Sequence, residues 1–215
     1  MLPILSALVD LVLPTRCAAC EGPRRVEEPA PWCAACAAGL PKGLFPLTNP
    51  PEPLRGAWVY ASYGGPVGAA IRRGKYGQDE AALQGLALVM AEASRGRLPR
   101  LDVVVPVPQR LSASLKRGFM PTAILAAAVA KGPWVCRCAT PYAAKGAKPR
   151  RAGLNAEARR ENLAAAFDAR GPLVQGRVLL IDDVITTGST AASCARELLC
   201  AGAKEVHLLA AASAR

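Results

Sequence analysis

Five short stretches rich in apolar residues recur along the chain, and each predicts a β-strand. The clearest is VLLI at 178–181, and the next is LDVVVPV at 101–107. Apolar runs without polar alternation are typical of strands covered on both faces, as in a parallel sheet. The predicted strands occupy residues 57–63, 101–107, 134–138, 178–181 and 205–210.

Stretches with helical spacing of apolar residues lie between these strands, at 66–73, 79–95, 122–130 and 191–203. In the second helix we expect Leu83, Leu86, Leu88 and Met90 to face the core. The alternation of strands and helices predicts an α/β fold with a parallel, doubly wound sheet. Ligands of such sheets bind beyond the carboxyl ends of the strands. The loops after Val107 and Ile181 should therefore face one cleft.

The segment after the 178–181 strand carries the most distinctive chemistry. Two carboxylates, Asp182 and Asp183, precede a loop of small and hydroxyl residues: Thr186, Thr187, Gly188, Ser189 and Thr190. The N–H groups of such a loop and of a helix N-terminus can hold a phosphate. Carboxylates can accept hydrogen bonds from sugar hydroxyls or help to hold Mg²⁺. The pattern predicts a site for a phosphorylated sugar; the alternative is an ordinary strand-turn-helix with an exposed Asp-Asp pair. It is not a Walker loop, because no Gly-Lys-Ser/Thr follows the strand.

Composition adds a preference for anionic partners. The chain has 215 residues and a formal net charge of +11, with 52% hydrophobic residues inflated by alanine and only 5% aromatics. Phosphorylated metabolites or nucleic acid fit this charge, as does a surface that is merely soluble. The chain is basic between residues 140 and 161, and the first half of this stretch is predicted to be a mobile loop. It would close over a leaving group, lie along a nucleic-acid backbone, or simply be solvated.

The first residues, MLPILSALVDLVL at 1–13, resemble a membrane anchor only superficially. The apolar run is too short to span a bilayer, is interrupted by Asp10, and has no basic start or cleavage site. It predicts a short amphipathic helix packed on the body. We expect a cytoplasmic protein without membrane insertion.

The eight cysteines include two C-x-x-C pairs, Cys17/Cys20 and Cys33/Cys36, separated by twelve residues. This spacing can place four thiolates around one structural Zn²⁺, and the intervening loop is too small to form a core. Each pair alone would also fit a redox motif. We expect an N-terminal helix and Cys₄ zinc ribbon over residues 1–45, a proline-rich linker at 40–53, and the α/β domain over 54–215. The other four cysteines (Cys136, Cys138, Cys194 and Cys200) are interpreted as small buried residues; a second metal site would need them to converge.

The segment LLIDDVITTGST resembles the phosphoribosyl-pyrophosphate (PRPP) motif of type I phosphoribosyltransferases. The whole chain is similar to the ComF family, phosphoribosyltransferase-like proteins named for DNA uptake in natural competence. The resemblance rests on the cysteine ribbon, the Ile71–Tyr76 segment, VPVP at 105–108 with Arg117-Gly118-Phe119, Arg159-x-x-Asn162 with Phe167, and the acidic loop.

The resemblance implies a site for PRPP. Its 5′-phosphate would lie on residues 186–190 and its ribose hydroxyls on Asp182 and Asp183. Its pyrophosphate would lie with Mg²⁺ near Pro108, Gln109, Arg110, Arg117 and Lys75. Asp182, Asp183 and Arg117 are the expected catalytic residues.

Two departures from the family pattern bear on turnover. Met120-Pro121 stands where the family continues Arg-Gly-Phe with Asn-Gln, and Arg151 stands where a glutamine is usual. A thioether cannot replace the hydrogen bonds of an amide. Either the substrate differs, or turnover has been lost while PRPP binding is kept.

Two functions remain open from the sequence. One is Mg²⁺-dependent phosphoribosyl transfer to an unidentified acceptor, which needs positioning and electrostatics but no protein nucleophile. The other is a PRPP-binding scaffold or regulator that engages single-stranded DNA or a helicase. The few aromatic residues favour a protein partner over direct binding of DNA. The single histidine, His207, is interpreted as structural.

Overall fold

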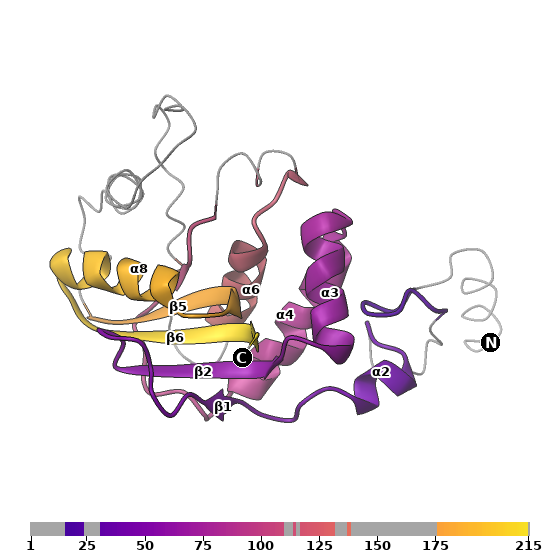
Figure 1. Cartoon of the computed structure of the whole chain (residues 1–215), viewed down its shortest axis with the longest axis horizontal. Coiled ribbons are helices and arrows are strands. Elements are labelled where there is room, and N and C mark those ends of the chain that lie inside the picture. The colour runs from indigo at the N-terminus through magenta and orange to yellow at the C-terminus, as the bar shows by residue number, and fades with distance from the viewer. Residues whose placement is uncertain are drawn as a thin grey trace.

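The computed structural model describes residues 16–23, 31–109, 114, 117–131, 137–138 and 176–214. A six-stranded sheet forms its centre, in the order β1-β2-β6-β5-β3-β4 (Figure 1). The strands are β1 (Phe45–Pro46), β2 (Gly56–Ser62), β3 (Val103–Pro106), β4 (Arg137–Cys138), β5 (Gly176–Ile185) and β6 (Ala203–Ser213). The helices are α2 (Ala34–Ala38), α3 (Gly65–Tyr76), α4 (Glu80–Ser94), α6 (Pro121–Ala130) and α8 (Ser189–Cys200).

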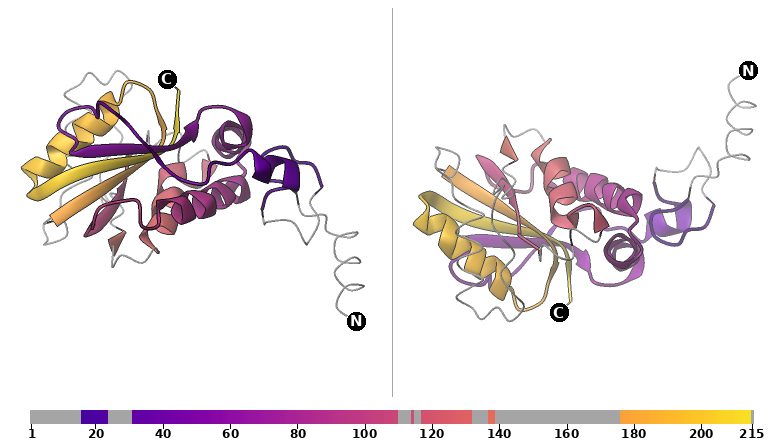
Figure 2. Two further views of the ribbon diagram at one scale, coloured as in Figure 1. Left: turned by 90° about the horizontal axis from the view of Figure 1, so that it is seen from below. Right: turned by 90° about the horizontal axis from the view of Figure 1, so that it is seen from above.

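All neighbouring strands run parallel except β1, which pairs antiparallel with β2 at the edge. Helix α8 covers one face of the sheet, and α3, α4 and α6 lie on the other (Figure 2). The predicted α/β fold with a parallel, doubly wound sheet is therefore confirmed.

The core divides between the two faces of the sheet. On β5, Val178 and Leu180 belong to the α8 side, whereas Leu179 and Ile181 belong to the side of α4 and α6. Successive side chains of a strand point to opposite faces, so a strand covered on both faces must be apolar at every position. Each of these four side chains is fully buried, which is worth roughly 1.5–3 kcal/mol per side chain.

Several elements differ from their predicted limits. Strand β5 continues four residues past Ile181 because β6 pairs with it as far as Ser213. Helix α3 continues past Arg73 to Tyr76. In α4, Leu83, Leu86 and Met90 are buried as predicted, but the prediction for Leu88 was wrong, since it is 60% exposed. Cys194 is buried, whereas Cys200 is exposed, contrary to its interpretation as a buried residue.

The cysteine segment packs against the sheet domain at α3 and α4, at the far end of the molecule from α8 (Figure 1). Cys17, Ala18 and Trp32 belong to the same buried cluster as Leu86 and Met90 of α4. The proline-rich stretch contributes β1 to the sheet. The helix predicted at 1–13, residues 134–136 and the basic stretch at 140–161 lie outside the described residues. None of the helices within the described ranges is long and apolar enough to cross a membrane.

Candidate functional site

The carboxylates Asp182 and Asp183 lie within β5, whereas the sequence predicted them beyond the end of the strand. Because they are consecutive in a strand, their side chains leave opposite faces of the sheet. Asp183 is 3% exposed, and Asp182 is partly buried. The two remain connected, since Asp182 Oδ1 accepts a hydrogen bond from the backbone N–H of Asp183 over 2.8 Å.

The hydroxyl loop begins where β5 ends and leads directly into α8. Thr186, Thr187, Ser189 and Thr190 are exposed. Gly188 adopts φ +77°, a left-handed conformation that suits glycine. A Cβ at Gly188 would lie 2.4 Å from Cγ of Pro51. The loop thus presents hydroxyl groups beside the N-terminus of a 12-residue helix, where N–H groups and the helix dipole favour an anion.

Four side chains from distant parts of the chain form a closed hydrogen-bonded circuit, which we call the carboxylate ring. Lys75 Nζ donates to Asp183 Oδ1 over 2.8 Å, and Gln109 Nε2 donates to Asp183 Oδ2 over 2.7 Å. Arg117 Nη2 donates to Gln109 Oε1 over 3.1 Å. Arg117 Nη1 donates to the backbone carbonyl of Lys75 over 3.3 Å, which closes the ring.

The ring leaves one strong donor unused. Arg117 Nε is buried and has no hydrogen-bond partner among the described residues. An unpaired buried N–H of a charged group is costly, on the order of 1–3 kcal/mol or more. The guanidinium is thus a ready donor to an anion that reaches this edge of the sheet.

The pKa of Asp182 is raised to about 7. Burial is the main cause and the negative charge of Asp183 adds to it, while the N–H of Asp183 and the charge of Lys75 act in the opposite direction. A cation close to Asp182 would favour its ionised form and so lower this pKa.

The structure brings together Lys75, Gln109, Arg117 and Asp183 among the residues predicted for the site. Pro108 immediately precedes Gln109 after β3, and Arg110 lies outside the described residues. Met120 caps the start of α6 without a side-chain hydrogen bond. Thr122 Oγ1 donates to the carbonyl of Val107 over 2.9 Å and so ties α6 to the end of β3. Thr122 was missed from the sequence, because nothing distinguishes its hydroxyl from those of other threonines.

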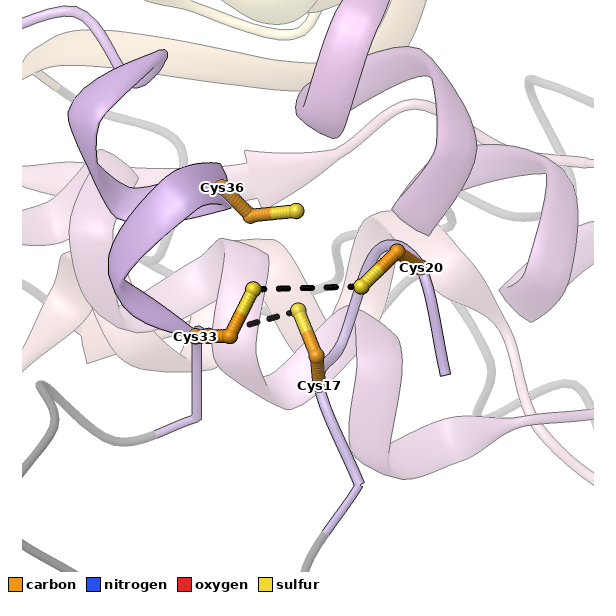
Figure 3. Close-up of side chains that lie close together, drawn as sticks. All are labelled: Cys17, Cys20, Cys33 and Cys36. Carbon is orange, nitrogen blue, oxygen red and sulfur yellow. Dashed lines mark hydrogen bonds between the residues drawn. The ribbon is translucent and has the colours of Figure 1, made fainter. Parts of the chain in front are cut away.

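The four cysteine sulfurs of the N-terminal segment converge (Figure 3). The Sγ atoms of Cys17, Cys20, Cys33 and Cys36 all lie within 4.8 Å of one another, and those of Cys20 and Cys33 are 3.8 Å apart. Tetrahedral coordination with Zn–S bonds of about 2.3 Å requires S···S separations of about 3.8 Å. The donor set and its spacing fit a metal ion such as zinc.

Polar contacts prepare one of these thiols for metal binding. Burial opposes ionisation of Cys17, but hydrogen bonds from the N–H groups of Cys33, Cys20 and Ala19 outweigh it and lower the pKa to about 6. The Cys17 sulfur lies 3.4 Å from the nitrogen of Cys33 and 3.5 Å from that of Ala19. In contrast, burial and the neighbouring cysteines raise the pKa of Cys36. A metal ion bound here would take the cysteines as thiolates, so its binding would release their protons.

Arg73 of α3 fastens the cysteine segment to the sheet domain. Its Nη1 donates to the carbonyl of Cys17 over 2.5 Å, and its Nε lies 3.1 Å from Glu21 Oε1. Its Nη2 pairs with Asp79, the N-cap residue of α4. This role of Arg73 was not predicted, since nothing in the sequence distinguishes Arg73 from Arg72. Two residues further along α3, Lys75 enters the carboxylate ring.

Comparison with known proteins gives a consistent group of relatives. No protein-family model matches the chain. The chain is 30% identical over 206 residues to the DNA utilization protein YhgH of Salmonella typhi, covering 89% of this chain and 87% of that protein. The YhgH proteins of Escherichia coli strain K12 and Shigella flexneri are each 30% identical over 204 residues, with the same coverage. Because the similarity extends over nearly the full length of this chain and of the compared proteins, the chain belongs to the family of the DNA utilization protein YhgH.

Proposed function

We propose that the carboxyl edge of the sheet binds PRPP with Mg²⁺, and that the protein uses this site in DNA utilization, as its resemblance to the ComF family implies. The carboxylate ring carries the proposal. It holds a cationic lysine, a cationic arginine with an unused buried N–H, and a buried carboxylate at the end of a parallel strand. The exposed hydroxyl loop begins three residues after that carboxylate.

The two halves of the site suit the two charged ends of this ligand. The 5′-phosphate would lie against the loop of residues 186–190 and the first turn of α8, where N–H groups point outward. The pyrophosphate would lie against Arg117 and Lys75, with Gln109 beside them and Arg110 following in the chain. Asp182 and Asp183 would accept hydrogen bonds from the ribose hydroxyls.

Carboxylate oxygens are the ligands Mg²⁺ prefers in proteins, so the acidic pair fits this ion. When bound, Mg²⁺ would neutralise charge on the pyrophosphate and so favour its departure from the sugar. The chain's own groups would orient the sugar and hold the pyrophosphate. We further propose that the cysteine cluster holds a structural zinc ion, because four thiolates leave no open position for chemistry.

A thermal-shift experiment with fragments of PRPP tests whether the hydroxyl loop binds the 5′-phosphate and Arg117 binds the pyrophosphate. Ribose 5-phosphate should raise the melting temperature of the wild type, and a Thr187→Val/Ser189→Ala variant should lose much of that response. Pyrophosphate with Mg²⁺ should also raise the melting temperature of the wild type. Arg117→Met should abolish the response to pyrophosphate but keep the response to ribose 5-phosphate. Arg196→Met, which removes an exposed arginine of α8, serves as the matched control. If neither fragment stabilises the wild type, or Arg196→Met has the same effect as Arg117→Met, the proposal fails.

A second candidate function is binding of PRPP without turnover. The protein would then be a scaffold or regulator that engages single-stranded DNA or a helicase. The carboxylate ring favours it, because both oxygens of Asp183 already accept protein hydrogen bonds. Met120 also supplies no amide near this edge. Pyrophosphate release measured with Mg²⁺, PRPP and candidate acceptors separates the two functions. Release above the level of an Asp182→Asn/Asp183→Asn variant supports transfer, and saturable binding without release supports the regulator.

A further inference from the structure

The cysteine cluster and the carboxylate ring meet at one turn of helix. The last turn of α3 carries both Arg73, which bonds the cysteine segment, and Lys75, which enters the ring. We infer that Arg73 is a positioning residue: the metal-bound cysteine segment holds Arg73, and Arg73 holds Lys75 in place for the pyrophosphate. Binding of Mg²⁺-pyrophosphate then depends on the metal at the cysteine cluster. This inference rests on the proposed PRPP and zinc sites.

Arg73 contacts the turn between Cys17 and Cys20 at two points. Its Nη1 donates to the carbonyl of Cys17, which also accepts a hydrogen bond from the N–H of Glu21 over 3.2 Å. Its Nε lies 3.1 Å from Glu21 Oε1, and its side chain is only 18% exposed. The sulfurs of Cys17 and Cys20 belong to the four that converge. A metal ion that fixes this turn therefore fixes the guanidinium of Arg73 as well.

Arg73 also joins the end of α3 to the start of α4. Its backbone carbonyl accepts hydrogen bonds from the N–H groups of Gly77, over 2.8 Å, and Asp79, over 3.3 Å. Its Nη2 pairs with the carboxylate of Asp79, which caps α4 by accepting from the N–H of Ala82. Lys75 lies in the short segment that these contacts enclose. Because both its Nζ and its carbonyl belong to the carboxylate ring, the position of this segment decides where two groups of the ring lie.

Close packing leaves this segment little room to shift independently. A Cβ at Gly74 of α3 would overlap Leu83 of α4, and a Cβ at Gly85 of α4 would overlap Pro31 of the cysteine segment. The Cβ at Gly85 would also lie 3.2 Å from that of Ala18. The two helices and the cysteine segment are thus packed closely, and well-packed interiors transmit a displacement because they contain few voids. Loss of the metal would therefore loosen the last turn of α3.

The chain offers a matched control in the neighbouring residue. Arg72 is exposed, and its guanidinium lies over the ring of Tyr63, 5.8 Å from the ring centre. Arg72→Met and Arg73→Met remove the same charge from adjacent positions of α3, so the general attraction of an anion falls similarly in both. Arg73→Met in addition breaks the contacts with the cysteine segment and with Asp79.

The effect should be confined to one half of the site. Lys75 belongs to the end proposed for the pyrophosphate, whereas the hydroxyl loop leads into α8 on the other face of the sheet (Figure 2). Calorimetric titration of the zinc-loaded chain with Mg²⁺-pyrophosphate and with ribose 5-phosphate measures the two halves separately. Arg73→Met should weaken pyrophosphate binding about fivefold or more and change ribose 5-phosphate binding by less than about twofold. Arg72→Met should change either affinity by less than about twofold.

Metal removal gives a second readout. Protein freed of zinc with a chelator and then transferred to Mg²⁺ buffer should bind pyrophosphate about as weakly as Arg73→Met does. Removing zinc from Arg73→Met should have little further effect, because the two changes act on one connection. Metal analysis should find the same zinc content in Arg73→Met and the wild type, since all four cysteines remain.

The variant Asp79→Ser separates position from charge. Serine keeps a good N-cap for α4 but removes the carboxylate partner of Arg73. Loss of a negative charge alone would raise the affinity for pyrophosphate, whereas the inference predicts a fall. Circular dichroism melting checks that each variant is folded, and Asp79→Ser decides the question if Arg73→Met is not.

Three results would each overturn the inference. They are equal pyrophosphate affinities of Arg73→Met and Arg72→Met, equal losses for the two probes in Arg73→Met, and a wild-type pyrophosphate affinity that does not change when zinc is removed. Failure of the zinc-loaded wild type to bind either probe would instead overturn the proposed PRPP site. The two failures are therefore distinguishable.

Discussion

Replacement of Lys75 by methionine tests the energetics of the carboxylate ring. The side chain of Lys75 is 22% exposed and that of its partner Asp183 only 5%. Removing one partner of a fully buried pair costs about 3–5 kcal/mol, because the other charge stays buried and unpaired. Gln109 still donates to Asp183 after the change, and Lys75 is partly solvated, so we expect a smaller loss of about 2–3 kcal/mol. For a domain of this size that corresponds to a fall in melting temperature of roughly 5–10 °C.

The test is a double-mutant cycle measured by urea denaturation in the absence of ligand. Asp183→Asn in the Lys75→Met background removes the unpaired charge, so it should recover most of the lost free energy of unfolding. Lys131→Met, at an exposed lysine after α6, should change stability by less than about 0.5 kcal/mol. The reasoning is refuted if Lys75→Met is as mild as Lys131→Met, or if adding Asp183→Asn makes the protein still less stable.

Three further perturbations concern the acidic pair, the cysteine cluster and the hydroxyl loop. The pKa of Asp182 is raised to about 7 from its ordinary value of 3.8, so the folded state binds the proton more tightly and stability falls as pH rises from about 4 to 7. The Asp182→Asn variant should therefore have a higher melting temperature than the wild type at pH 8. A difference in melting temperature that does not narrow towards pH 4 would contradict this. Cys17→Ser should release zinc, measured by metal analysis, and lower the melting temperature because Cys17 also belongs to the core; unchanged metal content would defeat the zinc assignment. Gly188→Ala should cost at least 1–2 kcal/mol in urea denaturation through its positive φ, with more from the contact with Pro51; a neutral result would mean that the loop rearranges freely.

The sequence predicted the sheet well because burial on both faces demands apolar residues at every position. It failed where packing overrides a local signal. The helix predicted at 66–73 continues through Gly74 to Tyr76. Gly74 allows α4 to pack closely, because a Cβ at this position would lie 2.2 Å from Cγ of Leu83. Leu88 was misassigned because it lies two positions from Leu86 and two from Met90, on the opposite side of α4.

The candidate site was predictable in its residue types but not in its connections. The adjacent carboxylates were predicted to follow the strand that ends at Ile181, whereas pairing with β6 keeps both in the strand. The carboxylate ring joins residues up to 108 positions apart, and no local pattern reports such a meeting. The same holds for Arg73, whose role depends on where the cysteine segment packs.

The central claim is that the carboxyl edge of the sheet binds Mg²⁺-PRPP, and calorimetric titration of PRPP into the zinc-loaded protein tests it most directly. Titrations of the wild type with and without Mg²⁺ are compared with the Asp182→Asn/Asp183→Asn variant. The account predicts saturable binding by the wild type that requires Mg²⁺ and is lost in the variant. Absence of heat with the wild type, or equal affinity in the variant, would contradict it.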